Sequence, residues 1–579
     1  VHNFVHMCRW VALRCLVALS ILSVIECSNQ VHGPCEVEFW PHPKDIVNGT
    51  EVIPISFNSL RIEYISSNVS PQEQTKVNKV VDQFTSTQFF HHRKIATTFP
   101  PFTLYIHLGP GFDYGAPTLQ TNETYKLFVG LSNNATIDTA SISGLIYGLE
   151  TFSQLILYNN QTEIPGWCDE VSFDGYFIPQ APWIVEDTPR FRWRGLMLDT
   201  SRHYLNIDVL EQTVLALAHT KMNVLHLHLT DAQSFPVEFQ PPLDVMAKKG
   251  SYTYNQRYSA EMLKELQQFA ELWGVRIIPE FDSPGHVYSW AYAFPEILVC
   301  KDFQPDWAQY CNEPPCGQLN PTLNQTYDVV HGIMAQAGNL FQDEFIHLGY
   351  DEVNFNCWNS SEEILRFMDE NQMNSQQLLQ YYFTNQLKGL PEGKTPVFWE
   401  EVFDEGLDIP NDSVIQVWNT LTEFTNVLEN SQNPVLLSNN DAWYLDCGMG
   451  NFVGRQPSWC DYNSWQNVYL NEPFEMVPHP VPQDYIDRTY GGEVAMWGEM
   501  VDATNVLHEA WPRAAAAGER LWSPASFSNP IEALPRILKH RQRLVDRGIP
   551  ATPIQPLWCN YNPSHCNPTH PPIDVMSHR

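Results

Sequence analysis

Phe345-Ile-His-Leu-Gly-Tyr-Asp-Glu-Val-Asn354 carries an apolar run into two adjacent carboxylic acids, Asp351 and Glu352. Within a strand, alternation would point these two side chains to opposite faces. At the end of a strand, where the chain turns, both can converge on one bound ligand. Two neighbouring acids are more often simply solvated in a loop, so the meaning of the pair depends on what the rest of the chain places around it.

This segment is one of a series of short apolar runs that alternate with helix-like stretches. The runs that we predict as strands are Arg194–Asp199, Val224–Leu229, Val275–Glu280, Phe345–Gly349, Pro396–Glu400, Val414–Trp418, Val435–Ser438 and Val494–Trp497. Eight strands that alternate with helices predict an α/β fold, a (β/α)8 TIM barrel, whose chemistry lies at the carboxyl ends of the strands. We expect the Ala-rich segment Trp511–Leu521 to be its final helix.

The chain before the barrel follows a different pattern. Strands are predicted at Leu60–Ile65 and Thr103–His107, and helices at Gln72–Phe90 and Thr139–Leu157. We therefore predict a smaller α+β domain over residues 35–180, a Pro-rich linker, the catalytic barrel over residues 190–550 and a Pro-rich tail over residues 551–579.

The composition narrows the class of partner. The 579-residue chain is 43% hydrophobic, as is typical of a globular protein with a large core. Its net charge of −33 argues against nucleic acid, because neutralising phosphates needs a basic face. The 18 Trp and 24 Tyr residues are high counts, and aromatic faces stack well on the apolar faces of sugar rings. The composition fits a neutral or amino-sugar substrate.

Met7 begins a stretch typical of a secretory signal. Arg9 and Arg14 provide the positive flank, and Cys15–Ile25 is an apolar run shorter than the about 20 residues that a bilayer span needs. We expect residues 1–27 to be a signal peptide cleaved near its end, with residues 1–6 as upstream sequence. An uncleaved anchor is the alternative.

Secretion or lysosomal delivery predicts glycans and disulfides. Asn-X-Ser/Thr sequons lie at Asn48, Asn68, Asn122, Asn134, Asn160, Asn324, Asn359 and Asn411. The predicted disulfides join Cys35 with Cys168, Cys300 with Cys357, Cys311 with Cys316, Cys447 with Cys460, and Cys559 with Cys566. The first would close the N-terminal region, and the second would tie a loop to the residues just after Glu352. No cysteine spacing fits a zinc site.

The predicted strands end in acids, histidines and aromatic residues. In chain order these are Asp199 and Arg202; His226, His228 and Asp231; Glu280, Asp282 and His286; Asp351 and Glu352; Trp399; Trp418; Trp443, Tyr444 and Asp446; and Trp497 and Glu499. A lone Trp is more often core, and a lone Arg more often joins a surface salt bridge. So many of these residues at one end of a barrel are hard to explain by packing, and they fit a sugar, which needs partners for its hydroxyls and flat apolar walls.

Several of these motifs resemble the glycoside hydrolase family 20 β-N-acetylhexosaminidases. They are Arg202-His-Tyr, Ser-Pro-Gly-His286, Asp351-Glu352 and Met496-Trp-Gly-Glu499, which come in the order of the family. The resemblance spans nearly the whole chain, and residues 312–321 resemble the arthropod branch more than the vertebrate lysosomal one. It implies a substrate-assisted mechanism, an exception to the two-carboxylate scheme, with no metal or organic cofactor and with a homodimeric assembly.

The resemblance also implies roles for individual residues. The substrate's own acetamido oxygen attacks the anomeric carbon while Glu352 acts as general acid. Asp351 holds the acetamido N–H, and Tyr444 binds the acetamido oxygen. Asp231 and His286 form a polar relay behind Glu352 that tunes its proton affinity. The expected walls of the N-acetyl pocket are Trp399, Trp418 and Trp497, and the expected partners of the sugar hydroxyls are Arg202, Asp446 and Glu499.

Two positions depart from the family pattern. Tyr350 stands where the family usually has a second Gly, and a backbone with positive φ suits Tyr poorly. Ala232 replaces an acid that commonly follows Asp231. A glycan-binding protein with impaired turnover is therefore an alternative, and a glycosidase of another family is a third reading, although it would not predict the tryptophan walls. We predict that Tyr350 is tolerated, with its ring at the edge of the site or packed beneath it.

A second aromatic group, formed by Trp307, Trp459 and Trp465, flanks the small loops that we predict to be disulfide-bonded. By resemblance to chitin-processing arthropod enzymes, Trp465 and Glu313 would grip the sugar next to the one cleaved. This predicts exo-cleavage of terminal N-acetylglucosamine, and also N-acetylgalactosamine, from the non-reducing ends of chitooligosaccharides or glycoconjugates. Two alternatives stay open: Trp465 packs its own loop, or a polar Asn312 favours the arms of N-glycans.

Overall fold

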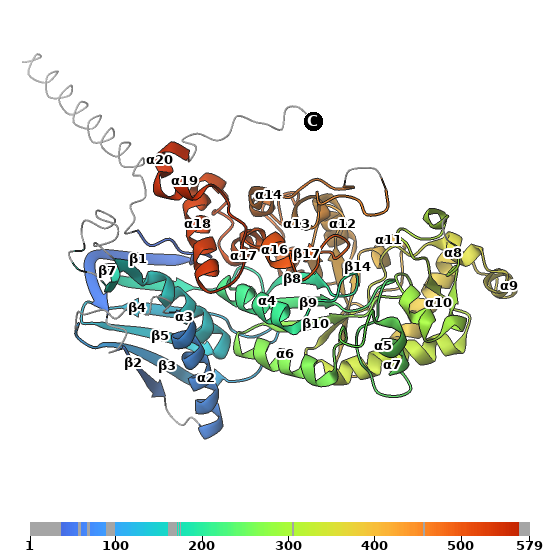
Figure 1. Ribbon diagram of the computed structural model, residues 1–579, viewed down its shortest axis with the longest axis horizontal. Helices are drawn as coiled ribbons and strands as arrows, with labels where there is room; N and C mark the ends of the chain where they lie inside the picture. The colour runs from blue at the N-terminus through green and yellow to red at the C-terminus, as the bar shows by residue number, and fades with distance from the viewer. Residues whose placement is uncertain are drawn as a thin grey trace, which may run out of the picture.

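The chain folds into a mixed sheet followed by a closed parallel barrel (Figure 1). In this computed structural model the described residues are 36–55, 60–66, 70–88, 99–159, 171, 173, 175–303, 306–454 and 458–566. The predicted signal peptide, the end of the tail, and the cysteines Cys35 and Cys168 lie outside these ranges. The predicted domain boundaries remain predictions.

The N-terminal sheet has the strand order β1-β7-β4-β5-β3-β2, with β6 paired to β7. Its strands are β1 (Asp45–Ile55), β2 (Leu60–Ser66), β3 (Phe102–Asp113), β4 (Tyr125–Val129), β5 (Asn134–Ser141), β6 (Leu157–Asn159) and β7 (Gly175–Asp187). Two helices, α2 (Pro71–Gln88) and α3 (Ile142–Leu155), cover one face (Figure 1). Along β4, Tyr125, Leu127 and Val129 are buried and the residues between them are exposed, as one-sided burial requires.

All eight predicted barrel strands are present, and they close into one parallel barrel. They are β8 (Trp193–Asp199), β9 (Val224–His228), β10 (Arg276–Glu280), β13 (Phe345–His347), β14 (Thr395–Trp399), β15 (Val414–Val417), β16 (Val435–Leu437) and β17 (Thr489–Met496). A short ribbon, β11 (Leu298–Val299) and β12 (Gln318–Leu319), lies outside the barrel. The predicted fold class is confirmed.

Helices follow most of the barrel strands. The longer ones are α4 (Ile207–His219), α6 (Ala260–Leu272), α7 (Asn324–Leu340), α9 (Glu362–Glu370), α10 (Ser375–Leu387), α12 (Leu421–Asn430), α17 (Arg513–Trp522) and α18 (Pro530–Asp546). The shorter ones are α5 (Val245–Gly250), α8 (Phe355–Asn359), α11 (Glu401–Asp404), α13 (Asn440–Trp443), α14 (Trp465–Leu470), α15 (Gln483–Arg488), α16 (Val506–Ala510), α19 (Leu557–Tyr561) and α20 (Pro563–Cys566). Among the helices of the described ranges, none combines the length and the apolar character that a bilayer crossing requires.

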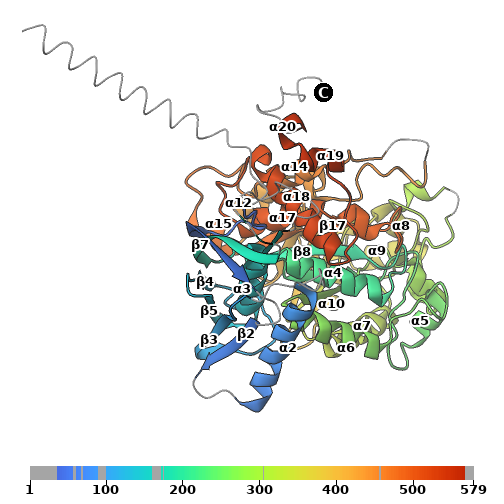
Figure 2. The ribbon, with the colours of Figure 1, turned by 60° about the vertical axis from the view of Figure 1, so that its left-hand side comes forward.

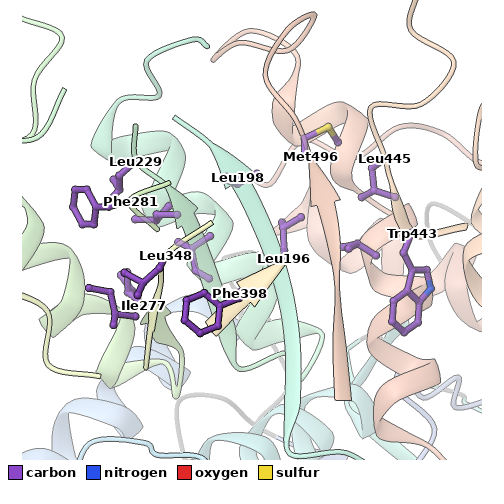
Figure 3. Close-up of a cluster of buried hydrophobic side chains, with 14 of the residues drawn as sticks. Leu196, Leu198, Leu229, Ile277, Phe281, Leu348, Phe398, Trp443, Leu445 and Met496 are labelled. Atoms are coloured by element: carbon purple, nitrogen blue, oxygen red, sulfur yellow. The ribbon is translucent and has the colours of Figure 1, made fainter. Parts of the chain in front are cut away.

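The strands are buried on both faces, which explains why they read as nearly continuous apolar runs. On β8, Leu196 and Leu198 belong to the large core between the strands and the surrounding helices, together with Phe398 (Figure 3). Met197, between them, faces the barrel interior and joins the aromatic cluster beneath the carboxyl end. Alternation is thus kept although neither face meets water.

The interior of the barrel is layered. Apolar residues fill the amino end: Trp193, Val224, Ile278, Phe345, Val397, Val414 and Leu436. Aromatic residues gather at the carboxyl end. Between the two layers the inward positions are polar and fully buried: His226, Glu280, His347, Gln416 and Glu493. Buried charges need partners, so this middle layer must form a satisfied network.

The prediction that the Ala-rich helix is the last one is wrong. It forms as α17, but α18 follows it, beside α17 and near the N-terminal sheet (Figures 1 and 2). Asn529 caps α18, and Pro535 stands one turn in, where a proline usually argues against a helix. Tertiary contacts override it, since Arg536 pairs with Glu519 of α17 and Arg547 with Glu150 of α3.

Candidate active site

A cavity of about 410 Å³ opens at the carboxyl ends of the barrel strands. Most of the residues singled out in the sequence line it: Arg202, His286, Glu313, Asp351, Glu352, Trp399, Trp418, Tyr444, Asp446, Trp497 and Glu499. Asp231 lies behind His286 and does not line the cavity. Barrel closure therefore brings together side chains that are up to about three hundred residues apart in the chain.

Asp351 and Glu352 both reach this cavity because the chain turns sharply after β13. Gly349 has a φ of +73°, and a Cβ there would lie 1.6 Å from Oδ1 of Asp282, so no other residue fits. Tyr350 and Glu352 also have positive φ values, +86° and +56°. Such backbone is costly for non-glycine residues and concentrates at functional sites. Here it replaces strand alternation and directs two neighbouring acids into one cavity.

The ring of Tyr350 is packed beneath the site, one of the two positions that the sequence predicts. It is buried edge-on against Phe398 of β14 at 5.4 Å and against Phe383 of α10 at 5.3 Å, measured between ring centroids. The side chain therefore leaves the cavity free and fills the space between the barrel and a helix.

We expect Tyr350→Gly to reduce stability more than turnover. Loss of a buried aromatic ring costs about 3–5 kcal/mol, and relief of the positive φ returns about 1–2 kcal/mol, so urea unfolding should show a net loss of roughly 1–4 kcal/mol. Tyr350→Phe, which keeps the ring, is the matched control and should stay close to wild type. A large rise in turnover of folded Tyr350→Gly would instead show that the natural enzyme is impaired.

His286 connects the two acids to Asp231. Its Nδ1 lies 3.3 Å from Oδ1 of Asp231, and its Nε2 lies 3.3 Å from Oε2 of Glu352 and 3.5 Å from Oδ2 of Asp351. Burial alone would lower the pKa of His286, but the carboxylates of Asp231 and Asp351 raise it well above its ordinary value. His286 is therefore a protonated centre among three acids.

The two adjacent acids have opposite pKa shifts. Burial would raise the pKa of Glu352, but the hydrogen bond from His286, its charge and a hydrogen bond from Asn312 lower it. Burial raises the pKa of Asp351, and the negative charges of Glu280 and Glu352 add to this. Environments that push neighbouring pKa values apart are typical of catalytic sites.

Asp282 is a site residue to which the sequence analysis assigned no role. Burial and the neighbouring charge of Asp351 raise its pKa well above the ordinary range, and the two carboxyl groups share a hydrogen bond. Its Oδ1 also accepts the backbone N–H of Tyr350 at 3.0 Å. Asp282 thus supports both the turn and the orientation of Asp351. Its place directly after β10, in line with the other strand-end acids, was the available signal.

One aromatic wall of the cavity consists of Trp399, Trp418, Trp497 and Tyr444. Trp399 donates its Nε1–H to Glu280 at 2.8 Å, and Trp418 donates to both oxygens of Glu401 at 3.1 Å. Tyr444 stacks on Trp418 with ring centroids 6.2 Å apart and an angle of 20° between the planes. Glu401, which the sequence analysis did not single out, therefore orients one wall.

Arg202 is the cationic centre of the site and lies 5.1 Å from the ring centroid of Trp497. Its guanidinium lies 2.5 Å from Glu313, 3.0 Å from Asp231 and 3.1 Å from Asp199. Glu499 follows at 3.9 Å. Burial raises the pKa of Glu499 to about 8, and that of Asp446, also in the lining, to about 7. At neutral and acidic pH such carboxyl groups can donate hydrogen bonds as well as accept them.

A family model described as the catalytic domain of glycosyl hydrolase family 20 matches residues 191–525, more than half of the chain. This chain belongs to glycosyl hydrolase family 20. It is a glycoside hydrolase of the β-N-acetylhexosaminidase type, as the resemblance of its motifs predicts.

Curated relatives of the family 20 enzyme include insect and mammalian proteins. A chitooligosaccharidolytic β-N-acetylglucosaminidase of Bombyx mori is 34% identical over 471 residues, which cover 78% of this chain and 75% of the relative. A probable β-hexosaminidase, fdl, of Drosophila melanogaster is 35% identical and covers 78% and 68%. The β-hexosaminidase subunit beta of Rattus norvegicus is 35% identical and covers 79% of each chain. Identities this similar leave the substrate to be argued from the site.

Solved structures agree with the fold. A chitobiase of Flavobacterium johnsoniae superposes with a TM-score of 0.71 at 24% identity, covering 90% of this chain and 74% of its own. An inactive mutant of a family 20 exo-β-N-acetylglucosaminidase from Vibrio harveyi also gives 0.71, at 22% identity, covering 89% and 78%. At these identities the similarity speaks for the fold alone.

The predicted role of Trp465 in the family 20 enzyme is contradicted by its position. Trp465 is 7% exposed, packs near Tyr469 and does not line the cavity. It opens α14, which packs against α17, so burial follows from the helix contact. Trp459 of the same loop is 61% exposed and does line the cavity, as do Trp307 and Glu313.

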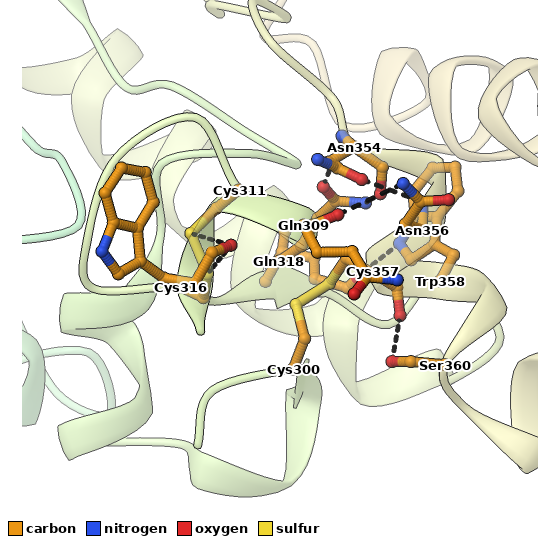
Figure 4. Close-up of a disulfide and its surroundings, with 12 residues drawn as sticks. Cys300, Gln309, Cys311, Cys316, Gln318, Asn354, Asn356, Cys357, Trp358 and Ser360 are labelled. Carbon is orange, nitrogen blue, oxygen red and sulfur yellow. Dashed lines mark hydrogen bonds between the residues drawn. A yellow bond between two sulfur atoms is a disulfide. The ribbon is translucent and has the colours of Figure 1, made fainter. Parts of the chain in front are cut away.

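Disulfides shape the loops at the rim. Cys300–Cys357 and Cys311–Cys316 lie side by side near Asn354 (Figure 4). Because these two bridges flank Asn312 and Glu313, they hold both cavity residues in place. Two further predicted bridges also form, Cys447–Cys460 and Cys559–Cys566.

The fifth predicted disulfide, between Cys35 and Cys168, is the exception. Neither Cys35 nor Cys168 is among the described residues, so the structure does not bear this pairing out. Unlike the four bridges above, the pairing of Cys168 with Cys35 stays a prediction. Mass spectrometry of a non-reducing peptide digest would test it, because a peptide that joins the two cysteines should disappear on reduction.

Three groups of side chains in the described ranges are close enough to share a cation. They are His226, Glu280 and His347; Asp231, His286 and Glu313; and Asp282, His286 and Asp351. Their members already pair with one another and with Arg202 or His228, which provides the partners that buried charges need. We assign no metal to them, and the absence of a cofactor stays a prediction.

Proposed function

We propose that this enzyme removes terminal non-reducing N-acetylglucosamine, and N-acetylgalactosamine, by substrate-assisted retaining hydrolysis. The observation that carries the proposal is the aromatic box of Trp399, Trp418 and Trp497 directly beside the adjacent acids Asp351 and Glu352. Apolar walls suit the methyl group of an acetamide, and the acids lie where its N–H and the leaving oxygen would be. The cavity volume falls in the range of small-molecule sites.

In the proposed mechanism the substrate supplies the nucleophile. The acetamido oxygen attacks the anomeric carbon, the glycosidic bond breaks, and Glu352 gives its proton to the leaving oxygen. Asp351, whose side chain lines the cavity, accepts the acetamido N–H. Tyr444 donates its hydroxyl hydrogen to the acetamido oxygen. Water then opens the oxazolinium ring while Glu352 takes a proton from it.

Sugar hydroxyls are assigned to the charged residues of the cavity lining. Arg202 donates, while Asp446 and Glu499 accept or donate according to protonation. The first test of the proposal is release of a chromophore by the purified enzyme from aryl N-acetyl-β-glucosaminide and aryl N-acetyl-β-galactosaminide. If the enzyme cleaves neither substrate, the proposed function is wrong and a glycan-binding protein is favoured.

For the natural substrate we propose short chitooligosaccharides, gripped by Trp459 in place of Trp465. Trp459 stands at the mouth, edge-on to Tyr444 with ring centroids 6.2 Å apart, so its exposed face is free for the next sugar ring. Trp307 and Glu313 line the same mouth. The chitooligosaccharidolytic relative from Bombyx mori supports this choice of substrate.

We expect Trp459→Ala to lower kcat/KM on chitotriose about 2- to 12-fold, because an aromatic contact is worth roughly 0.5–1.5 kcal/mol. Hydrolysis of an aryl N-acetylglucosaminide should be largely kept, since that substrate has no second sugar. Trp558→Ala is the matched control: this Trp is 58% exposed on α19 and lies outside the cavity lining.

Comparing wild type and Trp459→Ala on chitotriose and on a biantennary N-glycan also tests the N-glycan alternative. Asn312 lines the cavity and hydrogen-bonds Glu352, so a polar group stands near the leaving sugar. A wild type that prefers a biantennary N-glycan to chitotriose, or a Trp459→Ala variant that matches wild type on chitotriose, would remove the chitooligosaccharide assignment.

Secretion or lysosomal delivery, and a homodimer, remain part of the proposal. Asn48, Asn122, Asn324, Asn359 and Asn411 are exposed, as glycosylation requires, and Asn134 is half-buried. Asn68 and Asn160 lie outside the described residues. The four disulfides above favour an oxidising compartment.

A further inference from the structure

His228, the last residue of β9, lies behind the catalytic cavity and faces a carboxylate with each ring nitrogen. Its Nδ1 lies 2.7 Å from Oε2 of Glu280, and its Nε2 lies 3.0 Å from Oδ2 of Asp231. A neutral imidazole has one N–H, so one of these contacts would set a lone pair against a carboxylate. Both are hydrogen bonds only if His228 is an imidazolium.

The surroundings of His228 support its positive charge. The side chain is fully buried, which opposes ionisation, but Glu280, Asp231 and the more distant Asp199 of β8 raise its pKa well above the ordinary value. The edge contact with Trp497 adds no charge. Glu280 also meets His226 of β9, His347 of β13 and the indole N–H of Trp399 on β14, so three neighbouring strands hold it in place.

Asp231 links His228 to the acid site, because its two oxygens contact His228 and His286. Its Oδ2 meets two cations, His228 and Arg202, each at 3.0 Å. Its Oδ1 faces Nδ1 of His286 at 3.3 Å, and Nε2 of His286 reaches Glu352, also at 3.3 Å. Asp351 is the other acid that faces His286. His228 thus lies two contacts away from the proton that Glu352 has to deliver.

We propose, resting on the function proposed above, that His228 is a positioning residue for the acid step. Its positive charge offsets the negative charge of Asp231, so that Asp231 holds the proton of His286 less strongly and this proton can move to Glu352. Acid catalysis needs this proton on Oε2 of Glu352. It leaves Nε2 of His286, which becomes neutral and keeps the Nδ1–H that it donates to Asp231. An Asp231 carboxylate that kept only Arg202 on Oδ2 would hold the proton of His286 more strongly and leave Glu352 ionised.

The substitution His228→Gln should give two linked effects. Because the pair of His286 and Glu352 shares one proton, removing a nearby positive charge should raise the alkaline limb of the kcat/KM profile by about one pH unit. The proton should also stay on His286, which is nearer to Asp231, so plateau kcat/KM on chitobiose should fall roughly 10- to 100-fold. A dinitrophenyl N-acetylglucosaminide, whose leaving group needs little protonation, should lose much less.

His226→Gln is the matched control. His226 stands two residues earlier on β9, is equally buried, and faces Glu493 at 2.7 Å and Glu280 at 3.1 Å, but it does not contact Asp231. It should lower stability to a similar extent and leave the alkaline limb and the leaving-group dependence close to wild type.

Three outcomes would overturn the proposal. In the first, His228→Gln loses both substrates equally without a moved limb, which is what a merely structural role produces. In the second, His226→Gln moves the limb as far. The third comes from neutron diffraction on wild-type crystals at pH 7.5, which needs no variant to fold: a deuteron on only one ring nitrogen of His228 would refute the imidazolium. Inactivity of the wild type on both aryl N-acetyl-glycosides would instead refute the proposed function.

Discussion

Glu352→Gln should lower kcat/KM on chitobiose by about 10²- to 10⁴-fold, the range that general acid catalysis contributes. The sugar leaving group of chitobiose is a poor one and must be protonated as the glycosidic bond breaks. Gln has nearly the same shape and can still accept the hydrogen bond from Nε2 of His286, so the geometry of the cavity should be kept. What disappears is the transferable proton.

The loss should depend on the leaving group. A dinitrophenolate leaves without protonation, so the aryl substrate should lose far less than chitobiose in the same variant. Glu370→Gln, on the exposed end of α9, is the control for a generic loss of charge. The unfolding curve of Glu352→Gln should coincide with that of the wild type. Equal losses on the two substrates would contradict the assignment of Glu352 as the acid.

The second large effect concerns the nucleophile. An aryl β-glucoside lacks the acetamide, so its turnover should be at least ~10³-fold slower than that of the N-acetylglucosaminide, because a well-oriented intramolecular nucleophile is worth an effective molarity of about 10⁵ M or more. The box of Trp399, Trp418 and Trp497 would have no methyl group to enclose, and Asp351 no N–H to accept.

A stable mimic tests the same step without turnover. A thiazoline analogue of N-acetylglucosamine resembles the oxazolinium intermediate and should inhibit more tightly than the product sugar. Asp351→Asn should weaken this inhibition, since a neutral amide no longer stabilises the positive ring. Mass spectrometry of the enzyme with a slow fluorinated substrate should find no covalent sugar; an ester on Asp351 or Glu352 would replace the proposed mechanism by an ordinary two-carboxylate one.

Much of the barrel could be predicted because its strands obey a local rule. Strands buried on both faces read as short apolar runs, and each run from residue 194 to residue 497 became a strand. Because parallel strands end at one edge, the acids and aromatic residues that follow them could be expected at one site. The positions of Asp351, Glu352, His286 and Arg202 in the cavity follow from that rule.

Other features needed the folded chain. Trp459 and Trp465 flank the same cysteine, and local sequence does not tell which one a neighbouring helix covers; packing of α14 against α17 decided it. The turn at Tyr350 combines positive φ with a buried ring, which is possible only because Phe383 and Phe398 surround that ring.

The buried polar layer shows most clearly what the sequence determines and what only the tertiary structure decides. The sequence by itself determined the family, the eight strands and the strand-end residues, because each depends on short spacings. It did not determine that His226 pairs with Glu493, 267 residues away, or that His228 meets Glu280. A histidine inside an apolar run carries no local sign of its partner, and only closure of the barrel brings the carboxylates that make its burial and its charge tolerable.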